Sequence, residues 1–197
     1  MFEISGIGFN GTGALRNSTG TGQISFLKIN DNALINSGGS ANGSILNIAT
    51  FDTNLANGNS LANAFTRNRP VIDGNNKVLT FTGSRVSSDN IIIADPEFSS
   101  PLAGLVISGS SVVLRHEISA VVAPVGITSS NITGGITLAY AGPTFADLTN
   151  TSLGLGANVG SRLRFDNWHG ITHTVGITMD GVTAAANNGY NSIEMQF

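Results

Sequence analysis

Short runs in which apolar and polar residues alternate recur along this chain, and turn-forming residues separate them. Alternation with a period of two is typical of β-strands, because successive side chains point to opposite faces. The clearest runs lie at residues 23–29, 44–51 and 76–82. Further strands are predicted at residues 90–93, 105–108, 112–122, 136–140, 162–165, 171–179 and 192–197.

Helical patterns are weak, because Gly, Asn, Ser and Thr dominate and all are poor helix formers. The best helical candidate, residues 53–66, is interrupted by Asn57-Gly58-Asn59. Asp73-Gly74 and Asn188-Gly189 favour tight hairpin turns. We therefore predict an all-β fold with a sandwich- or jelly-roll-like domain, while the same short strands also fit a solenoid.

The composition changes along the chain and predicts two parts. Residues 1–66 are rich in Gly and Asn, and we expect an extended N-terminal β arm or separate β layer there. Residues 67–197 hold the longer strands and are expected to form the main β domain. Pro70 lacks a backbone donor and favours extended conformations before it, so residues 67–70 are a suitable connection.

Charged residues make up only 11% of the chain, against roughly 25% in ordinary soluble domains. The net charge is −3, and Lys28 and Lys77 are the only lysines, so a nucleic-acid partner is not expected. The absence of Cys excludes disulfides and cysteine-ligated zinc. A neutral surface of Gly, Asn, Ser and Thr packs against other copies with little charge to desolvate, which favours an assembly protein and a homodimer or homotrimer.

The beginning of the chain has neither a basic segment nor an apolar core of the kind found in signal peptides. No stretch approaches the roughly 18 apolar residues that a membrane helix needs. We therefore expect a protein that is made in the host cytoplasm, has no membrane partner and reaches its destination inside a particle.

Residues 6–20 resemble the repeats of β-helical passenger domains of bacterial autotransporters, in which a G-x-G-A-L-R-N turn leads into stacked strands. The matching residues are Gly11-Thr12-Gly13-Ala14-Leu15-Arg16-Asn17, and Ala33-Leu34-Ile35-Asn36-Ser37 continues the likeness. The resemblance covers about the first 50 residues and implies β structure there. The chain as a whole resembles bacteriophage virion proteins, since it is cysteine-free, poor in charge and rich in Gly, Asn and Thr.

His169 and His173 are candidate metal ligands, because residues four apart on a strand share a face. Asp166 or Asp180 would supply a carboxylate. The alternative is that the two histidines are polar residues on an exposed or subunit-facing sheet. This alternative is favoured, because the sequence offers no third ligand at a clear spacing. Asx-rich segments at residues 30–32 and 73–76 fit either Ca²⁺ ligation or turns.

Several side chains are candidates for contact with other protein. Arg115 and Glu117 share a strand face and are expected to pair with each other, a neighbouring strand or a subunit. Arg162 and Arg164 share a face opposite Leu163 and Phe165, so they fit either a surface strand or an acidic partner. The remaining candidates are Trp168, which is a core or interface anchor, and Phe2, Ile4 and Phe9 of the N-terminal segment.

No G-x-S-x-G motif or carboxylate pair suggests catalysis, so we expect no enzyme, no cofactor and no resident metal. The first hypothesis is a virion structural protein, a capsid decoration or cement subunit that stabilises a shell through contacts with itself and a major capsid protein. The alternatives are a phage tail or fibre protein, and a β-solenoid adhesin or glycan-binding module.

Overall fold

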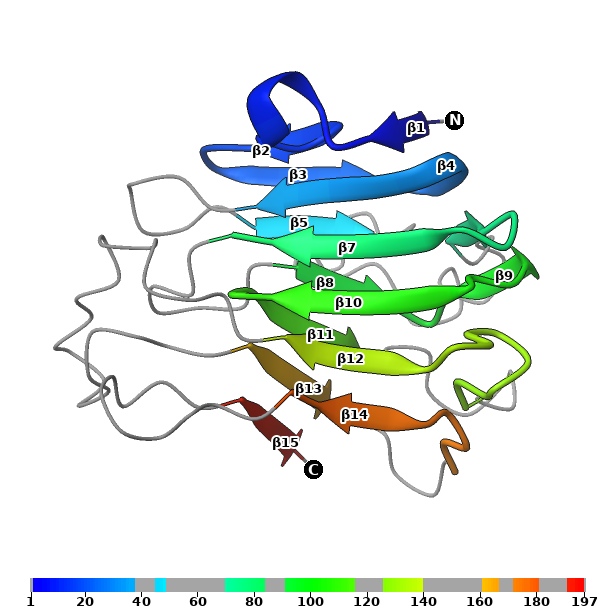
Figure 1. The fold of residues 1–197 in the computed structure, drawn as a ribbon. Coiled ribbons are helices and arrows are strands. Elements are labelled where there is room, and N and C mark those ends of the chain that lie inside the picture. The colour runs from blue at the N-terminus through cyan, green and yellow to red at the C-terminus, as the bar shows by residue number, and fades with distance from the viewer. Residues whose placement is uncertain are drawn as a thin grey trace, which may run out of the picture.

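The structure, a computed structural model, describes residues 2–37, 45–48, 70–83, 91–115, 126–139, 161–166, 172–180 and 191–196 (Figure 1). These residues form β-strands, connecting turns and a single 3-10 turn, η1 (Phe9–Gly11). The prediction of a nearly all-β chain is confirmed. The helical candidate at 53–66 and the expected boundary at 66–67 lie outside the described residues.

The strands form two sheets (Figure 1). Each turn of the chain, which we call a coil, contributes strands to both sheets and lies on the coil before it. Along the chain, the strands pass to and fro between the two sheets. Sheet A contains, in order, β14 (Ile177–Met179), β12 (Ile136–Ala139), β10 (Gly104–Ser108), β7 (Val78–Thr82), β4 (Phe26–Ser37), β6 (Val71–Asp73) and β9 (Glu97–Ser100), with β1 (Phe2–Gly6) and β2 (Leu15–Asn17) also paired to β4. Sheet B contains β15 (Ser192–Gln196), β13 (Arg162–Asp166), β11 (Ser111–Arg115), β8 (Ile91–Ala94), β5 (Ile45–Ile48) and β3 (Thr21–Ile24).

All strand pairs among the described residues are parallel. A jelly roll is built from antiparallel strands, so this part of the fold prediction is not confirmed. The arrangement is that of a parallel β-solenoid, in which each coil pairs with the coils before and after it. Alternation along one strand does not encode the direction of its neighbour, which is why the sequence left this open.

The long strand β4 takes part in two separate lines of strand pairing. Its first part pairs with β1 and β6, and its second part pairs with β2 and β7. The Asp73-Gly74 pair predicted a hairpin turn. The turn between β6 and β7 does not close a hairpin, because both strands pair with β4 and not with each other. It turns a corner instead, with positive φ at Asn75 and Asn76. The strands β6 and β9 pair with each other beside this corner.

The core lies between the sheets and consists of straight columns of apolar side chains. In sheet A, one column runs through Leu15, Ile35, Phe81, Ile107, Leu138 and Met179. In sheet B, another runs through Ile24, Ile48, Ile93, Leu114, Phe165 and Met195. The strands of residues 2–37 and 45–48 share this core with the later coils, since Ile4, Ile29 and Leu46 belong to the same buried cluster.

The outer sides of the two sheets differ. In sheet A, the strands β7, β10 and β12 alternate between buried and half-buried residues, so their outer side is accessible. In sheet B, Val113 and Ser111 point away from the core and are nevertheless fully buried. Parallel strands covered on both sides read as continuous apolar runs, which explains the Ile91-Ile92-Ile93-Ala94 sequence of β8.

The corners of the coils account for part of the glycine and asparagine content. A Cβ atom at Gly83 would collide with the carbonyl oxygen of Ser37 on the preceding coil, and one at Gly74 would collide with that of Pro101. Asparagine side chains tie neighbouring coils at these corners. Asn17 Nδ2 donates to Ile45 O at 2.8 Å, and Asn191 Nδ2 donates to Leu138 O at 2.7 Å.

The column geometry predicts that the unfolding free energy lost when an apolar side chain is truncated depends mainly on which coil carries that side chain. Ile107→Ala removes a fully buried side chain in the middle of its column and should cost about 2 to 5 kcal/mol of unfolding free energy. Met195→Ala changes a side chain that is 64% exposed on the last coil and should cost less than about 1 kcal/mol. Chemical denaturation of both variants measures the difference, and equal losses would contradict the column description.

Candidate functional site

The arginines predicted as contact residues lie on the outer side of sheet B and are joined to carboxylates. Arg115 Nε lies 3.0 Å from Asp166 Oδ2, and Arg164 Nη2 lies 3.4 Å from the same oxygen. The register explains this, because Arg115 and Asp166 are direct partners in the β11–β13 ladder. Asp166 is itself buried, at 7% exposure. The sequence suggested Asp166 as a metal ligand, whereas it is the carboxylate that two arginines share.

The third arginine extends this network to the last coil. Arg162 Nη1 lies 3.3 Å from Glu194 Oε2 on β15, and Arg162 Nε donates to Ser111 Oγ at 2.8 Å. Arg162 and Arg164 share one side of β13, opposite the buried Leu163 and Phe165, as the alternation predicts. The network therefore links three successive coils, and an acidic partner would have to compete with these ion pairs.

The other predicted contact residues have different fates. Phe2 and Phe9 are exposed, at 48% and 84%, and remain available for contact. Ile4 is buried at 6% exposure in the common core, so its role in the free chain is packing. Glu117 and Trp168 lie outside the described residues.

His173 is the described member of the candidate metal pair, while His169 lies outside the described residues. Its ring lies 4.7 Å from that of Phe165, and its Nδ1 accepts a hydrogen bond of 3.1 Å from the Ile127 N–H. Burial lowers the pKa of His173. Among the described residues, no group of three or more His, Asp or Glu side chains is arranged to hold a metal ion.

The Asx-rich segments that fit Ca²⁺ ligation are engaged in links between coils. Asp31 Oδ1 lies 3.7 Å from Lys77 Nζ, and Asn32 Oδ1 accepts a 2.9 Å hydrogen bond from the Val78 N–H. Asp73 accepts a hydrogen bond from Ser100 Oγ on the next coil. Because these oxygens hold turns and neighbouring strands, the turn interpretation describes them better than the Ca²⁺ interpretation.

Glu3 and Lys28 form a further link between neighbouring coils. Glu3 Oε2 lies 3.7 Å from Lys28 Nζ and accepts a 2.9 Å hydrogen bond from Asn30 Nδ2. The hydrogen bond from Asn30 and the charge of Lys28 lower the pKa of Glu3.

The outer side of sheet A is a candidate surface that the sequence analysis missed. Its strands lie next to one another with no other described strand over them (Figure 1). Two columns of uncharged side chains cross its middle strands. The sequence feature that could have revealed this surface is the set of outward-facing residues in the alternating strands. The first column contains Leu34, Thr80, Val106, Thr137 and Thr178, and the second contains Asn36, Thr82, Ser108 and Ala139.

Comparison with known proteins does not assign this arrangement to a family. No family model, no curated protein and no solved structure matches the chain. Within the residues that the structure describes, no helix is long and apolar enough to span a membrane. The functional argument therefore rests on the surfaces described above.

We predict that Asp166 is the member of the arginine network on which stability depends most. Asp166→Asn removes the carboxylate that the half-buried Arg115 and Arg164 share and should cost about 2 to 3 kcal/mol, because two poorly solvated charges lose an ion-pair partner. Glu194→Gln, whose side chain is 41% exposed, is the matched control and should cost less than about 1 kcal/mol. Urea denaturation measures both variants, and an Asp166 variant as stable as the control would count against the network.

We also predict that His173 makes the stability depend on pH. Its pKa is lower in the folded chain than its usual 6.5, so the unfolded chain binds the proton more readily. Its contribution to stability is therefore complete above about pH 6.5 and decreases as the pH falls below that value. His173→Gln should flatten the decrease in melting temperature between about pH 7.5 and about pH 5.5. Parallel curves for the two proteins would show that this histidine does not contribute.

Proposed function

We propose that this chain is an adhesin-like β-solenoid module that binds an extended glycan on the outer side of sheet A. The observation that carries the proposal is the regular display of hydroxyl-bearing and small side chains on that surface. Thr80, Thr137 and Thr178 occupy one column, in which Val106 lies between Thr80 and Thr137, and neighbouring rungs of a sheet are about 4.8 Å apart. The resemblance of residues 6–20 to autotransporter passenger repeats supports the same role.

The physical argument concerns the cost of binding. The two columns carry no charge from Leu34 to Thr178 and from Asn36 to Ala139, so a neutral sugar displaces water without stripping an ion of its hydration. Threonine side chains on strands have few rotamers, so little conformational entropy is lost when they become ordered against a ligand. Uncharged side chains held at a fixed spacing suit a polymer that itself repeats. Neither catalysis nor a cofactor is needed for this role.

A glycan array tests the proposal, followed by titration of the sugars that bind. Thr80→Lys and Thr137→Lys place a long charged side chain in the centre of the surface and should weaken binding by roughly tenfold or more. Ser129→Lys introduces the same charge at an exposed turn outside sheet A and should leave binding unchanged. A chain that binds no glycan, or variants that bind as well as the unaltered protein, would refute the proposal.

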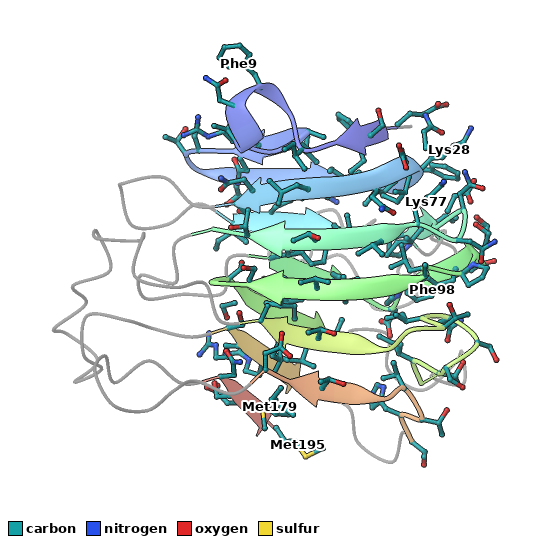
Figure 2. The ribbon with its side chains drawn as sticks, viewed as in Figure 1. Phe9, Lys28, Lys77, Phe98, Met179 and Met195 are labelled. Carbon is teal, nitrogen blue, oxygen red and sulfur yellow. The ribbon has the colours of Figure 1, made fainter. Side chains whose placement is uncertain are left out.

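A second candidate is a virion structural protein, either a capsid decoration subunit or a tail or fibre component. The observation that favours it is the segment between β1 and β2, residues 7–13, which projects from the first coil and exposes Ile7 and Phe9 at 61% and 84% (Figure 2). We call this segment the hook. In a particle, the hook would lie against a capsid protein, and sheet A would pack against a neighbouring subunit.

Incorporation into particles tests this second candidate. Removing residues 1–22 would also remove Ile4 from the core, so point changes on the hook are cleaner. Phe9→Ser should reduce incorporation several-fold, while the conservative Thr12→Ser on the same exposed turn should not. Equal incorporation of the Phe9 variant and the unaltered chain would exclude the hook as the attachment point.

A further inference from the structure

Three sequences of the form N-x-Ser/Thr, the acceptor motif for N-linked sugars, lie among the described residues. They begin at Asn10, Asn17 and Asn131. Such sugars are bulky and lie on the surface, so the asparagine amide must be accessible and its segment must be able to enter an enzyme. The structure distinguishes the three sites by what holds each amide.

The amide of Asn17 is tied to the next coil. Its Nδ2 donates to Ile45 O at 2.8 Å and to Gly20 O at 3.1 Å. Asn17 is also the last residue of β2, where it pairs with Ser37 of β4. A sugar on this nitrogen would remove one of the two hydrogen bonds and stand between neighbouring coils, so the fold protects this site.

Asn131 is held by its own turn and by a neighbouring coil. Its Oδ1 accepts hydrogen bonds of 2.9 and 3.0 Å from the N–H and the hydroxyl of Thr128. Its backbone oxygen accepts a 2.9 Å hydrogen bond from the Leu102 N–H. Thr133, which supplies the hydroxyl of the motif, donates both its N–H and its hydroxyl to Leu102 O. The amide and the hydroxyl of this site are therefore both engaged.

Asn10 lies within the hook, where every residue from Ile7 to Thr12 is exposed. Its side chain forms no hydrogen bond with the other described residues. Its backbone is in the left-handed region, with φ 52° and ψ 28°, which asparagine adopts more readily than most residues. Figure 2 shows the preceding residue, Phe9, pointing away from the stacked strands. The Asn10 amide is thus presented to solvent.

The turn that carries Asn10 is held by short-range bonds. Gly11 N–H donates to Gly8 O at 3.2 Å, and the Thr12 hydroxyl donates to Phe9 O at 2.7 Å. Opening this turn breaks bonds within the hook and leaves the pairing of β1 and β2 with β4 intact. The segment can therefore enter an enzyme at little cost to the fold, as low-stability loops do.

We propose that the hook is a modification site and that Asn10 is the acceptor of an N-linked sugar. The co-reactant is an activated sugar, whose anomeric carbon is bonded to a phosphate of a nucleotide or lipid carrier. Asn10 Nδ2 forms a bond to that carbon, and the bond from the carbon to the phosphate oxygen breaks. The carrier phosphate leaves with the electron pair, and Nδ2 loses one proton to a base of the glycosyltransferase.

A sugar at this position would cover apolar surface. Ile7 and Phe9 lie beside Asn10 in the hook and are 61% and 84% exposed, and such surface promotes association unless something shields it. The modification uses the hook and not the outer side of sheet A, so it can fail while glycan binding by sheet A succeeds, and the reverse. It would stand between Phe9 and a capsid protein, and so works against attachment through the hook.

Glycosylation in vitro tests the proposal. The folded chain carries Asn42→Gln and Asn150→Gln, which remove two further motifs outside the described residues, and is incubated with UDP-glucose and an asparagine glycosyltransferase. Glycopeptide mass spectrometry should find a hexose on Asn10 and at least about tenfold less on Asn17 and Asn131, because those sites must first open. Thr12→Ala should abolish modification of Asn10, whereas Thr12→Ser keeps the hydroxyl and should retain it.

Peptides of residues 6–14, 13–21 and 127–135 are matched controls, because they carry the three motifs without the fold. The enzyme used is one that accepts all three peptides. Modification of Asn17 or Asn131 in the folded chain as readily as Asn10 would overturn the proposal, and so would a folded chain that stays unmodified. The chain purified from the cells that make it should carry the sugar on Asn10, and a bare Asn10 there is equally contrary to the proposal.

Discussion

Parallel pairing of each coil with the next, residue by residue, is the interaction on which the rest of the structure depends. A single coil of this chain has apolar residues on its inner side and nothing to cover them, so it gains stability only from the coils above and below it. The register turns inward residues into buried columns, such as Leu79, Leu105 and Ile136, and outward residues into half-buried ones, such as Thr80, Val106 and Thr137. Surfaces and core are therefore consequences of one constraint.

This constraint explains why the strands were predictable and their partners were not. Alternation located β5, β7, β10, β12 and β13 within a few residues, because each strand has one inward side. Pairing is different, since Arg115 meets Asp166 across 51 residues of chain. The coils also differ in length, because Leu79, Leu105, Ile136 and Ile177 share a column but are unevenly spaced in the sequence. The repeat is thus structural, and no fixed sequence period reveals it.

The candidate surfaces divide in the same way. The common face of Arg162 and Arg164 was predictable from two residues of spacing, and so was the place of Asp166 on the same face. Strand pairing is what brings Glu194 of β15 to Arg162 and Arg115 of β11 to Asp166. Ile4 looked like an arm residue because its own segment is polar, and it is buried because β1 pairs with β4. The exposed Met179 and Met195 have ordinary core patterns, and only their position on the last coil leaves them uncovered.

The low charge content has a cause within the fold itself. In a parallel stack, outward residues of successive coils lie about 4.8 Å apart, so a column of like charges would repel along its whole length. The charged columns of this chain avoid that, as in the sequence Glu3, Lys28 and Asp73 and in the pair Arg115 and Asp166. Where alternation is not used, the columns are neutral, as in the columns from Leu34 to Thr178 and from Asn36 to Ala139 of sheet A. The neutral outer columns that we propose as a glycan-binding surface therefore also avoid the repulsion that a stack of like charges would cause.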